Sequence, residues 1–395
     1  MRAVGFFDLI WMRRIDAPEV IAAALRHPRL HDRAAVENAL SRHFFAPFVH
    51  QEVAEGEAFE RRAAMSRAAL GLDEAIVAAR SRQALSRIRP GEVGDLLDEV
   101  RRTVTRAMVW VTFGDTELEP VVLAAVADFD RAIKMMGTPE LRRRRELADR
   151  LRARLSERAP EGTTLRAMQL AAGDVGVDEQ IDHVASVLLG TGIIQVTDVV
   201  THALIALSQA PSVARRATDG AVLAETIRRF PVNASLTRKA RGDVEVEGVR
   251  LRAGEALTVV PMTVNRRGWS SPERFDPDRH ERERGACFGF GHGPRACPAR
   301  RLAMTMAEVV LGAYRQIGVT VEPGYRHRRS LAMPPRARLG PGACAGRSRQ
   351  QSARRWLRYL RVCAVTYPGV AMQELSRMRA AQGPPPKMPP HSLPH

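Results

Sequence analysis

The stretch Phe288–Ala299 reads FGFGHGPRACPA and is the most informative part of the chain. Three glycines, at 289, 291 and 293, are spaced two residues apart, and Cys297 follows the last of them by four residues. Glycine lets the backbone turn tightly and approach a ligand closely. A packed core needs no such loop, so the stretch indicates that a metal or a cofactor binds here.

Three other interpretations of this loop compete with a cofactor thiolate. A phosphate-binding loop would need the spacing G-x-G-x-x-G or a Lys-Ser/Thr pair, and the sequence has neither. A zinc site could draw on His280, Cys287, His292 and Cys297, but these residues lack the usual C-x2-C or H-x3–5-H spacing. Cys297 could also be a small buried side chain without chemistry.

A haem thiolate site explains more of the loop. A single cysteine ligand needs a backbone that wraps around its sulfur and directs N–H groups at it. Arg295 could pair with a haem propionate, and Phe290 could pack against the macrocycle. The helix predicted to follow Cys297 would place its positive end near the thiolate and lower the pKa of the thiol.

The segment Phe290–Ala299 matches the cysteine-loop signature of the cytochrome P450 family. The sequence ETIR, with Glu225 and Arg228, resembles the E-x-x-R helix of that family, and SPERFDPDRH, with Arg274, resembles its P-E-R-F turn. The resemblance implies a mainly α fold with small β sheets, with Cys297 as the proximal ligand of a haem b iron. It also implies an ion network of Arg274 with Glu225 and Arg228 behind the haem.

The same resemblance assigns further cofactor-binding residues. Phe290 and Gly291 belong to the cysteine loop, and Arg238 in LTRKA is expected to be a second propionate partner. The segment GEAFERRAAM resembles the helix that supplies another, which implies Arg62. Ala58 stands where the family often has His or Trp, so the pattern is incomplete at this helix.

Residues 178–208 form a long segment that is apolar on nearly every side from Val184 to Val200, which predicts a central helix. Gly190 and Gly192 lie in its middle, where each costs about 1 kcal/mol relative to Ala. Either the glycines allow a close helix crossing, or they mark a groove or bulge where something lies against the backbone.

This segment resembles the distal helix that crosses the haem face in the family. Gly192 would leave room there for oxygen and substrate. The acid and alcohol that normally relay protons to bound oxygen are replaced by Ile194 and Gln195. Thr197 lies about 200° further round the helix and cannot take their place. A substrate group or water would then relay the proton, or the reaction would be an oxidative coupling or a peroxide-driven oxidation.

The 395 residues carry a net charge of +17, and the C-terminal part contributes disproportionately. From residue 340 to 395, nine Lys and Arg stand against one acid, Glu374, and the segment ends Pro-rich. We expect a haem-thiolate domain over residues 1–339 and a basic, disordered tail over residues 340–395.

The N-terminus is about 40 residues shorter than the family pattern. Four cysteines do not make a disulfide framework, and neither a signal peptide nor a membrane-spanning segment is expected, which favours the cytoplasm.

The expected function is oxidation of a small organic molecule in specialised metabolism, with O2 and with electrons from a ferredoxin and its reductase. The basic side chains Arg295, Arg300 and Arg301 would attract an acidic ferredoxin, and nucleic acid is not an expected partner of such an enzyme. The alternative is a non-catalytic or haem-free basic protein whose Arg-rich tail binds nucleic acid or an anionic membrane. The segment RRWLRYLR in this tail could form a basic amphipathic helix.

Overall fold

The computed structural model describes residues 13–381, with gaps at 31, 34, 50–55, 87–92, 234 and 328–330. Most of the described chain is helical, as the sequence predicts. The helices are α2 (Pro18–Arg26), α3 (Ala35–Phe45), α4 (Gly56–Leu70), α5 (Glu74–Leu85), α6 (Leu96–Phe113), α7 (Glu119–Ile133), α8 (Leu141–Ser156), α9 (Thr164–Ala171), α10 (Val177–His183), α11 (Gly192–Gln209), α12 (Pro211–Arg216), α13 (Asp219–Arg229), α14 (Pro261–Val264), α15 (Arg279–Arg282), α16 (Arg300–Ile317) and α17 (Arg349–Ala381).

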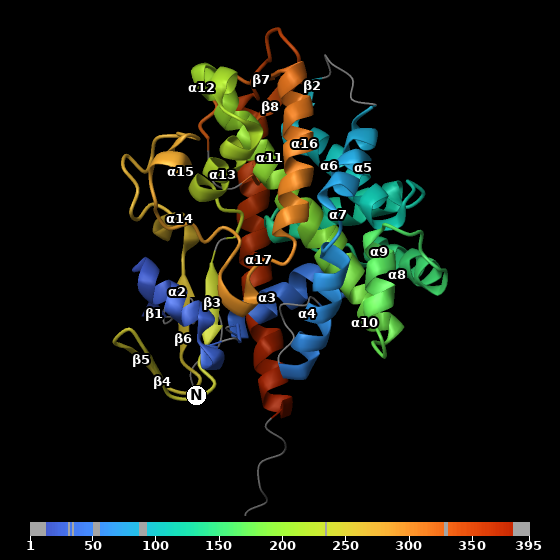
Figure 1. Cartoon of the computed structure of the whole chain (residues 1–395), viewed down its shortest axis with the longest axis vertical. Coiled ribbons are helices and arrows are strands. Elements are labelled where there is room, and N and C mark those ends of the chain that lie inside the picture. The colour runs from blue at the N-terminus through green and yellow to red at the C-terminus, as the bar shows by residue number, and fades with distance from the viewer. Residues whose placement is uncertain are drawn as a thin grey trace, which may run out of the picture.

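Three small sheets complete the fold. The strands are β1 (Arg13–Arg14), β2 (Val93–Asp95), β3 (Leu236–Lys239), β4 (Val244–Val246), β5 (Val249–Leu251), β6 (Ala256–Val259), β7 (Val319–Val321) and β8 (Arg336–Leu339). One sheet has the order β1-β6-β3, another β2-β8-β7, and β4 pairs with β5 alone. Figure 1 shows β1, β3 and β6 together with the β4–β5 hairpin on one side of the molecule, and helices α4 to α10 on the other.

The β4–β5 hairpin confirms the clearest strand prediction. Val244, Val246 and Leu251 are buried, whereas Glu245 and Arg250 between them are exposed, as alternation along a half-buried strand requires. Gly248 supplies the turn with a φ of +76°, which a residue without a Cβ adopts at no steric cost. The hairpin therefore follows from local sequence alone.

The predicted central helix is present as one continuous element. It consists of α10, a π-helical segment (Val184–Thr191) and α11. It contacts α6, α7, α8, α13 and α16, so it runs through the middle of the core. Its length and mean hydropathy of 1.6 would suffice to cross a membrane, but 72% of its apolar window is buried inside the protein. The burial explains the composition as that of a core helix.

Both interpretations of the glycines in this helix have a counterpart in the structure. A Cβ on Gly190 would lie 3.3 Å from Phe45 and 3.4 Å from Phe129, so the glycine permits a close crossing. The π-helical segment that ends at Thr191 is the bulge, because its wider turn interrupts the regular hydrogen-bond ladder. Such segments often mark functional sites.

The C-terminal segment differs from its expected disorder. Residues Arg349–Ala381 form helix α17, which passes α3 and runs along much of the length of the molecule in Figure 1. Arg347 anchors its start through ion pairs with Asp95 and Glu322. The prediction of disorder was therefore wrong for residues 349–381, and residues 382–395 lie outside the described part of the chain.

Candidate cofactor site

The loop that ends at Cys297 is held by its own backbone. The amide of Cys297 donates to the carbonyl of Phe290 at 2.8 Å, and the amide of Gly291 donates to the carbonyl of Phe288 at 3.0 Å. Gly291 and Gly293 have φ angles of +69° and +72°, in the left-handed region that favours glycine. The glycines thus fold the chain back so that Cys297 is presented at the end of a closed turn.

Two glycines of the loop also let it pack closely on its neighbours. A Cβ on Gly289 would lie 2.1 Å from the Cγ2 atom of Ile227, and one on Gly293 would lie 2.2 Å from the carbonyl oxygen of Leu25. Neither distance is possible between real atoms, so any side chain at these positions would displace the loop. The loop is therefore fixed between α13 and α2.

The surroundings of Cys297 suit a thiolate ligand. Its side chain is partly exposed, and α16 begins three residues later, at Arg300, which places a helix N-terminus next to the cysteine. The guanidinium of Arg300 lies 5.5 Å from the centre of the Phe290 ring. Cationic groups and unpaired helical N–H groups near a cysteine favour its ionised form.

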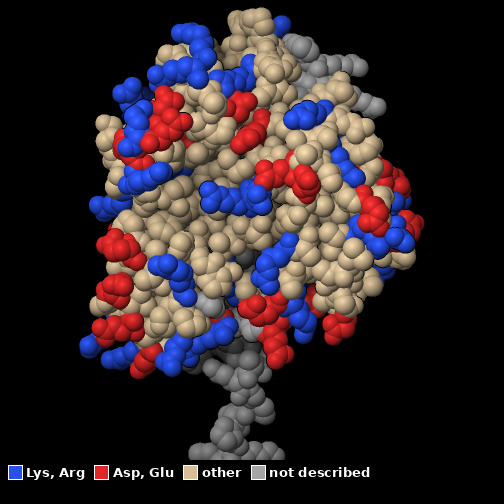
Figure 2. Space-filling model, viewed as in Figure 1, with Lys and Arg blue, Asp and Glu red and all other residues tan. Residues whose placement is uncertain are grey.

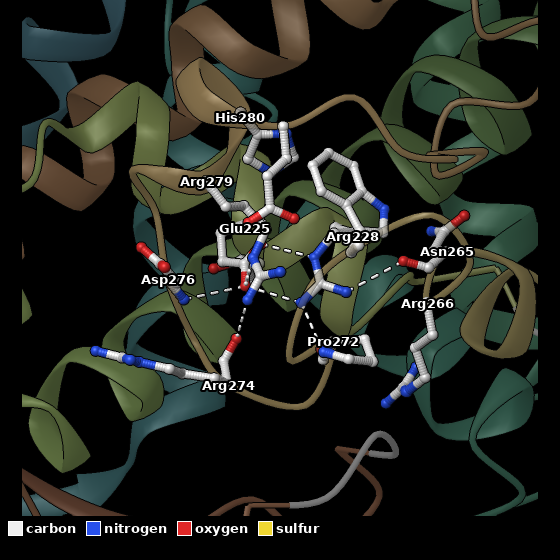
Figure 3. A network of polar contacts seen from close by, with 12 residues as sticks. Glu225, Arg228, Asn265, Arg266, Pro272, Arg274, Asp276, Arg279 and His280 are labelled. Carbon is white, nitrogen blue, oxygen red and sulfur yellow. Dashed lines mark hydrogen bonds and ion pairs between the residues drawn. The ribbon is translucent and has the colours of Figure 1, made fainter.

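A buried ion network centres on Glu225 and Arg228 of α13 (Figure 3). Glu225 and Arg228 on α13 are fully buried and form two hydrogen bonds, of 2.7 and 2.8 Å. Burial opposes ionisation of Glu225, but the hydrogen bonds from Arg228 and the approach of His280 Nε2 to 3.5 Å hold the pKa of its carboxyl below the usual value. The E-x-x-R helix is thus present as predicted.

The second arginine of this network is not the predicted one. Arg279 is 1% exposed and pairs with Glu225 at 3.2 Å. It also donates to the backbone carbonyl of Arg274, and the side chain of Arg274 itself is exposed. Assigning Arg274 to the network was therefore wrong. The turn points this side chain outwards and contributes only a carbonyl group.

Asn265 connects the network to the cysteine loop. Its backbone carbonyl accepts a hydrogen bond from Arg228 at 3.1 Å, and its side-chain oxygen accepts one from the amide of Phe288 at 2.8 Å. Asn265 is fully buried. The ion network therefore fixes the first residue of the loop through one side chain, which the sequence motifs do not reveal.

The distal helix presents a polar edge in an otherwise apolar segment. Thr191, Gly192 and Gln195 are partly exposed, although they lie in the helix that crosses the core, and Ile194 is buried. The side-chain nitrogen of Gln195 donates to the side-chain oxygen of Asn233 at 3.2 Å. These three residues lie on one side of the helix, within an arc of about 100°, and Asn233 is an addition that no sequence motif indicated.

Thr197 faces a different side of the central helix from Gln195. Its side chain is 1% exposed, whereas Gln195 two residues earlier is partly exposed. The two side chains lie about 200° apart around the helix, so they face different surroundings. A Cβ on Gly192 would lie 3.3 Å from the Cε atom of Met108, so a larger residue at this position would require the Met108 side chain to move.

The three predicted propionate partners have different surroundings. Arg295 lies over the ring of Phe59 at 3.8 Å, and Arg238 on β3 is buried and donates to the carbonyl of Thr237. Arg62 contacts the start of the central helix, where its Nε atom lies 2.8 Å from Oε1 of Glu179. It also pairs with Asp182 at 3.6 Å and donates to the carbonyl of Val49. Arg62 thus has acidic partners on the central helix, and all three arginines stay candidates for propionate binding.

The donor set fits a haem and not a zinc ion. Among the described residues, no group of three or more His, Cys, Asp or Glu side chains is placed to hold a metal ion. A haem needs a single thiolate from the protein, and Cys297 stands at the end of a loop whose glycines leave no space for a Cβ, so it could supply that thiolate. The two buried or stacked arginines match the acidic edge of that cofactor.

Comparisons with known proteins agree with this geometry. The family model described as cytochrome P450 matches residues 220–314, which include α13 and the cysteine loop. A 20-oxo-5-O-mycaminosyltylactone 23-monooxygenase of Streptomyces fradiae is 33% identical over 153 residues, which are 37% of this chain and 35% of the relative. Cytochrome P450 3A18 of Rattus norvegicus is 31% identical over 25% of this chain and 22% of its own length.

The likeness to solved structures extends over most of the chain. A mutant of P450 EryK in complex with erythromycin B has a TM-score of 0.62 and 18% identity, over 85% of this chain and 92% of its own. A 6-coordinated cytochrome P450 from Thermus thermophilus has a TM-score of 0.62 and 22% identity, over 83% and 92%. The fold is thus shared along the chain, whereas the sequence match spans about a third or less of the curated relatives.

Proposed function

We propose that this chain, which belongs to the cytochrome P450 family, is a haem-thiolate monooxygenase that oxidises a small organic molecule. The observation that carries the proposal is the closed loop at Cys297, with its 2.8 Å hydrogen bond to Phe290 and its left-handed glycines. The loop packs between α13 and α2, and Asn265 ties it to the buried ion network. This arrangement serves a cofactor that needs one thiolate.

Each part of the site has a role toward bound haem b. Cys297 supplies the ligand sulfur, and Phe290 and Gly291 border it. Arg238 and Arg295 bind the propionates, while the Glu225, Arg228 and Arg279 network keeps the loop in place. Haem held by a cysteine thiolate activates O2, because the thiolate pushes electron density towards the iron and favours O–O cleavage.

The distal residues restrict the substrate. Ile194 has no proton to give, and Gln195 can orient water but cannot act as an acid near neutral pH. A substrate with its own hydroxyl or phenol group would complete the relay. The curated relative and the EryK structure carry the names of oxygenated substrates, a glycosylated tylactone and erythromycin B. A polar product of specialised metabolism is therefore the proposed substrate class, and hydroxylation or oxidative coupling is the proposed reaction.

Electrons are proposed to come from a ferredoxin and its reductase in the cytoplasm. Arg300 and Arg301 are exposed at the start of α16, next to the cysteine loop. Figure 2 shows basic and acidic side chains interspersed on the visible face, and Arg301 pairs with Glu74 at 2.9 Å. Glu74 thus offsets part of the charge near the loop, and Arg300 is the exposed cation proposed to attract an acidic partner.

The spectrum of the reduced, carbon monoxide-bound protein tests the proposal. We expect the wild type to give the thiolate-type band and Cys297→Ala to lose it together with substrate oxidation. Cys287→Ala, ten residues earlier in the same segment, is the matched control and should keep the band. If Cys297→Ala keeps it, Cys297 is not the ligand. If the wild type binds no haem, the haem-free alternative holds instead.

A further inference from the structure

Helix α17 carries a concentration of exposed apolar side chains. Trp356 is 42% exposed, Leu357 66% and Leu360 57%. At about 100° per residue, these three side chains fall within an arc of about 100°. Ala353 and Ala364 lie in the same arc and are exposed as well. The helix therefore has an apolar stripe on its outer side.

Basic residues border this stripe. Arg354, Arg358 and Arg361 are exposed and lie next to it within an arc of about 60°. Residues 349–373 contain five arginines and no Asp or Glu, so nothing within this part of the helix neutralises them. An apolar stripe beside an unbalanced basic stripe is the pattern of a helix that lies in a membrane interface.

The opposite side of α17 fixes which face points outwards. Thr366 is buried, and Tyr359 and Val362 are partly buried. Arg355, on this inner side, pairs with Asp95 at 3.3 Å. The inner side thus attaches to the domain, and the outer side with Leu357 and Leu360 is exposed.

We propose that the outer face of α17 binds the surface of an anionic lipid membrane. The apolar stripe would enter the boundary between headgroups and acyl chains, where Trp is favoured, and the arginines would bind lipid phosphates. Nucleic acid would engage the arginines and leave the exposed leucines unused. A second copy of the chain would bring the three outer arginines against the same three residues, which charge repulsion disfavours.

Flotation of the full-length protein with lipid vesicles tests this binding. We expect binding to vesicles of phosphatidylcholine and phosphatidylglycerol at about 0.1 M salt, and at least about tenfold weaker binding to phosphatidylcholine alone. Leu357→Asp combined with Leu360→Asp should weaken binding to the anionic vesicles by at least about tenfold. Replacing Arg354, Arg358 and Arg361 by Gln should also weaken it and reduce its dependence on salt.

Leu170→Asp is the matched control, because Leu170 is 67% exposed on α9, away from the basic stripe. This variant should bind as the wild type does. Binding that survives the double leucine change, or that Leu170→Asp abolishes equally, overturns the proposal. So does binding to duplex DNA without binding to vesicles, or dimerisation through α17 in its place. Circular dichroism checks that each variant is folded. Flotation measures vesicle binding directly, so the result does not depend on whether the protein binds haem.

Discussion

The side chain of Gln195 on the distal helix donates a hydrogen bond to the side chain of Asn233, 38 residues later, at 3.2 Å. Two amides therefore bridge the helix and the segment after α13 at the position where relatives are expected to keep an alcohol. Each amide has a donor and an acceptor to spare, so the pair can hold water or a polar substrate group. Neither can release a proton near neutral pH.

Proton delivery should therefore limit oxidation of unreactive hydrocarbons. We expect the wild type to consume reductant with little product when the substrate carries no polar group. Changing Gln195 to Thr together with Ile194 to Asp should raise product formed per reductant consumed, because general acid assistance is worth about 10²–10⁴-fold. Asn233→Ala is the control, since it breaks the bridge without adding an acid. Efficient coupling in the wild type that the double change only reduces would refute the relay argument.

The choice between Arg279 and Arg274 gives a sharp test of the ion network. Arg279→Ala leaves the buried carboxylate of Glu225 with one arginine fewer, and breaking such a pair costs about 3–5 kcal/mol. We expect much less soluble protein and a lower urea concentration at the midpoint of unfolding. Arg274→Ala removes an exposed side chain and should change stability by about 0.5 kcal/mol or less. Equal losses in both variants would contradict the assignment.

The glycines of the cysteine loop should be intolerant of any side chain. Gly293→Ala places a Cβ 2.2 Å from the carbonyl oxygen of Leu25 and forces a left-handed φ, which together should cost about 2 kcal/mol or more. Thermal unfolding and haem content measure the effect. Gly176→Ala is the control, because its φ is −59° and its Cβ would meet nothing within 4 Å. A wild-type haem content in Gly293→Ala would show that the loop can shift freely.

Features that depend on local chemistry were predictable from the sequence. The loop at Cys297, the pair of Glu225 and Arg228 on one helical turn, and the β4–β5 hairpin all follow from residue types at fixed spacing. The central helix was predictable because its composition is apolar on nearly every side. In each case the residues that form the sequence pattern are the same residues that form the structural feature.

Features that depend on which way a side chain points were not predictable. Arg274 and Arg279 lie in one Arg-rich stretch, and the turn between them decides which one enters the core. Arg62 also pairs with Glu179 and Asp182, which lie more than a hundred residues away, and no local pattern predicts these two partners. The tail has the charge of a disordered segment, yet α17 forms where Arg355 and Thr366 find contacts on the domain.

Asp198, one turn after Gln195, should make stability depend on pH. Burial raises the pKa of its carboxyl to about 6, although Lys134 at 2.7 Å and Arg101 oppose the shift. The native state therefore binds a proton between about pH 4 and 6 that the unfolded state has released, and stability falls as pH rises through this range. At about 1.36 kcal/mol per pKa unit, the loss is at most about 3 kcal/mol.

Asp198→Asn isolates this contribution, because the amide keeps the shape of the side chain and cannot ionise. Urea unfolding of both proteins at pH values from about 4.5 to 7.5 gives the difference in the free energy of unfolding. We expect the wild type to lose stability relative to Asp198→Asn up to about pH 6 to 7, and the difference to be constant above it, because Asp198 is then ionised in both states. A difference that stays constant from about pH 4.5 to 7.5 would contradict the raised pKa, because a carboxyl whose pKa is ordinary or lowered is almost fully ionised in both states over this range.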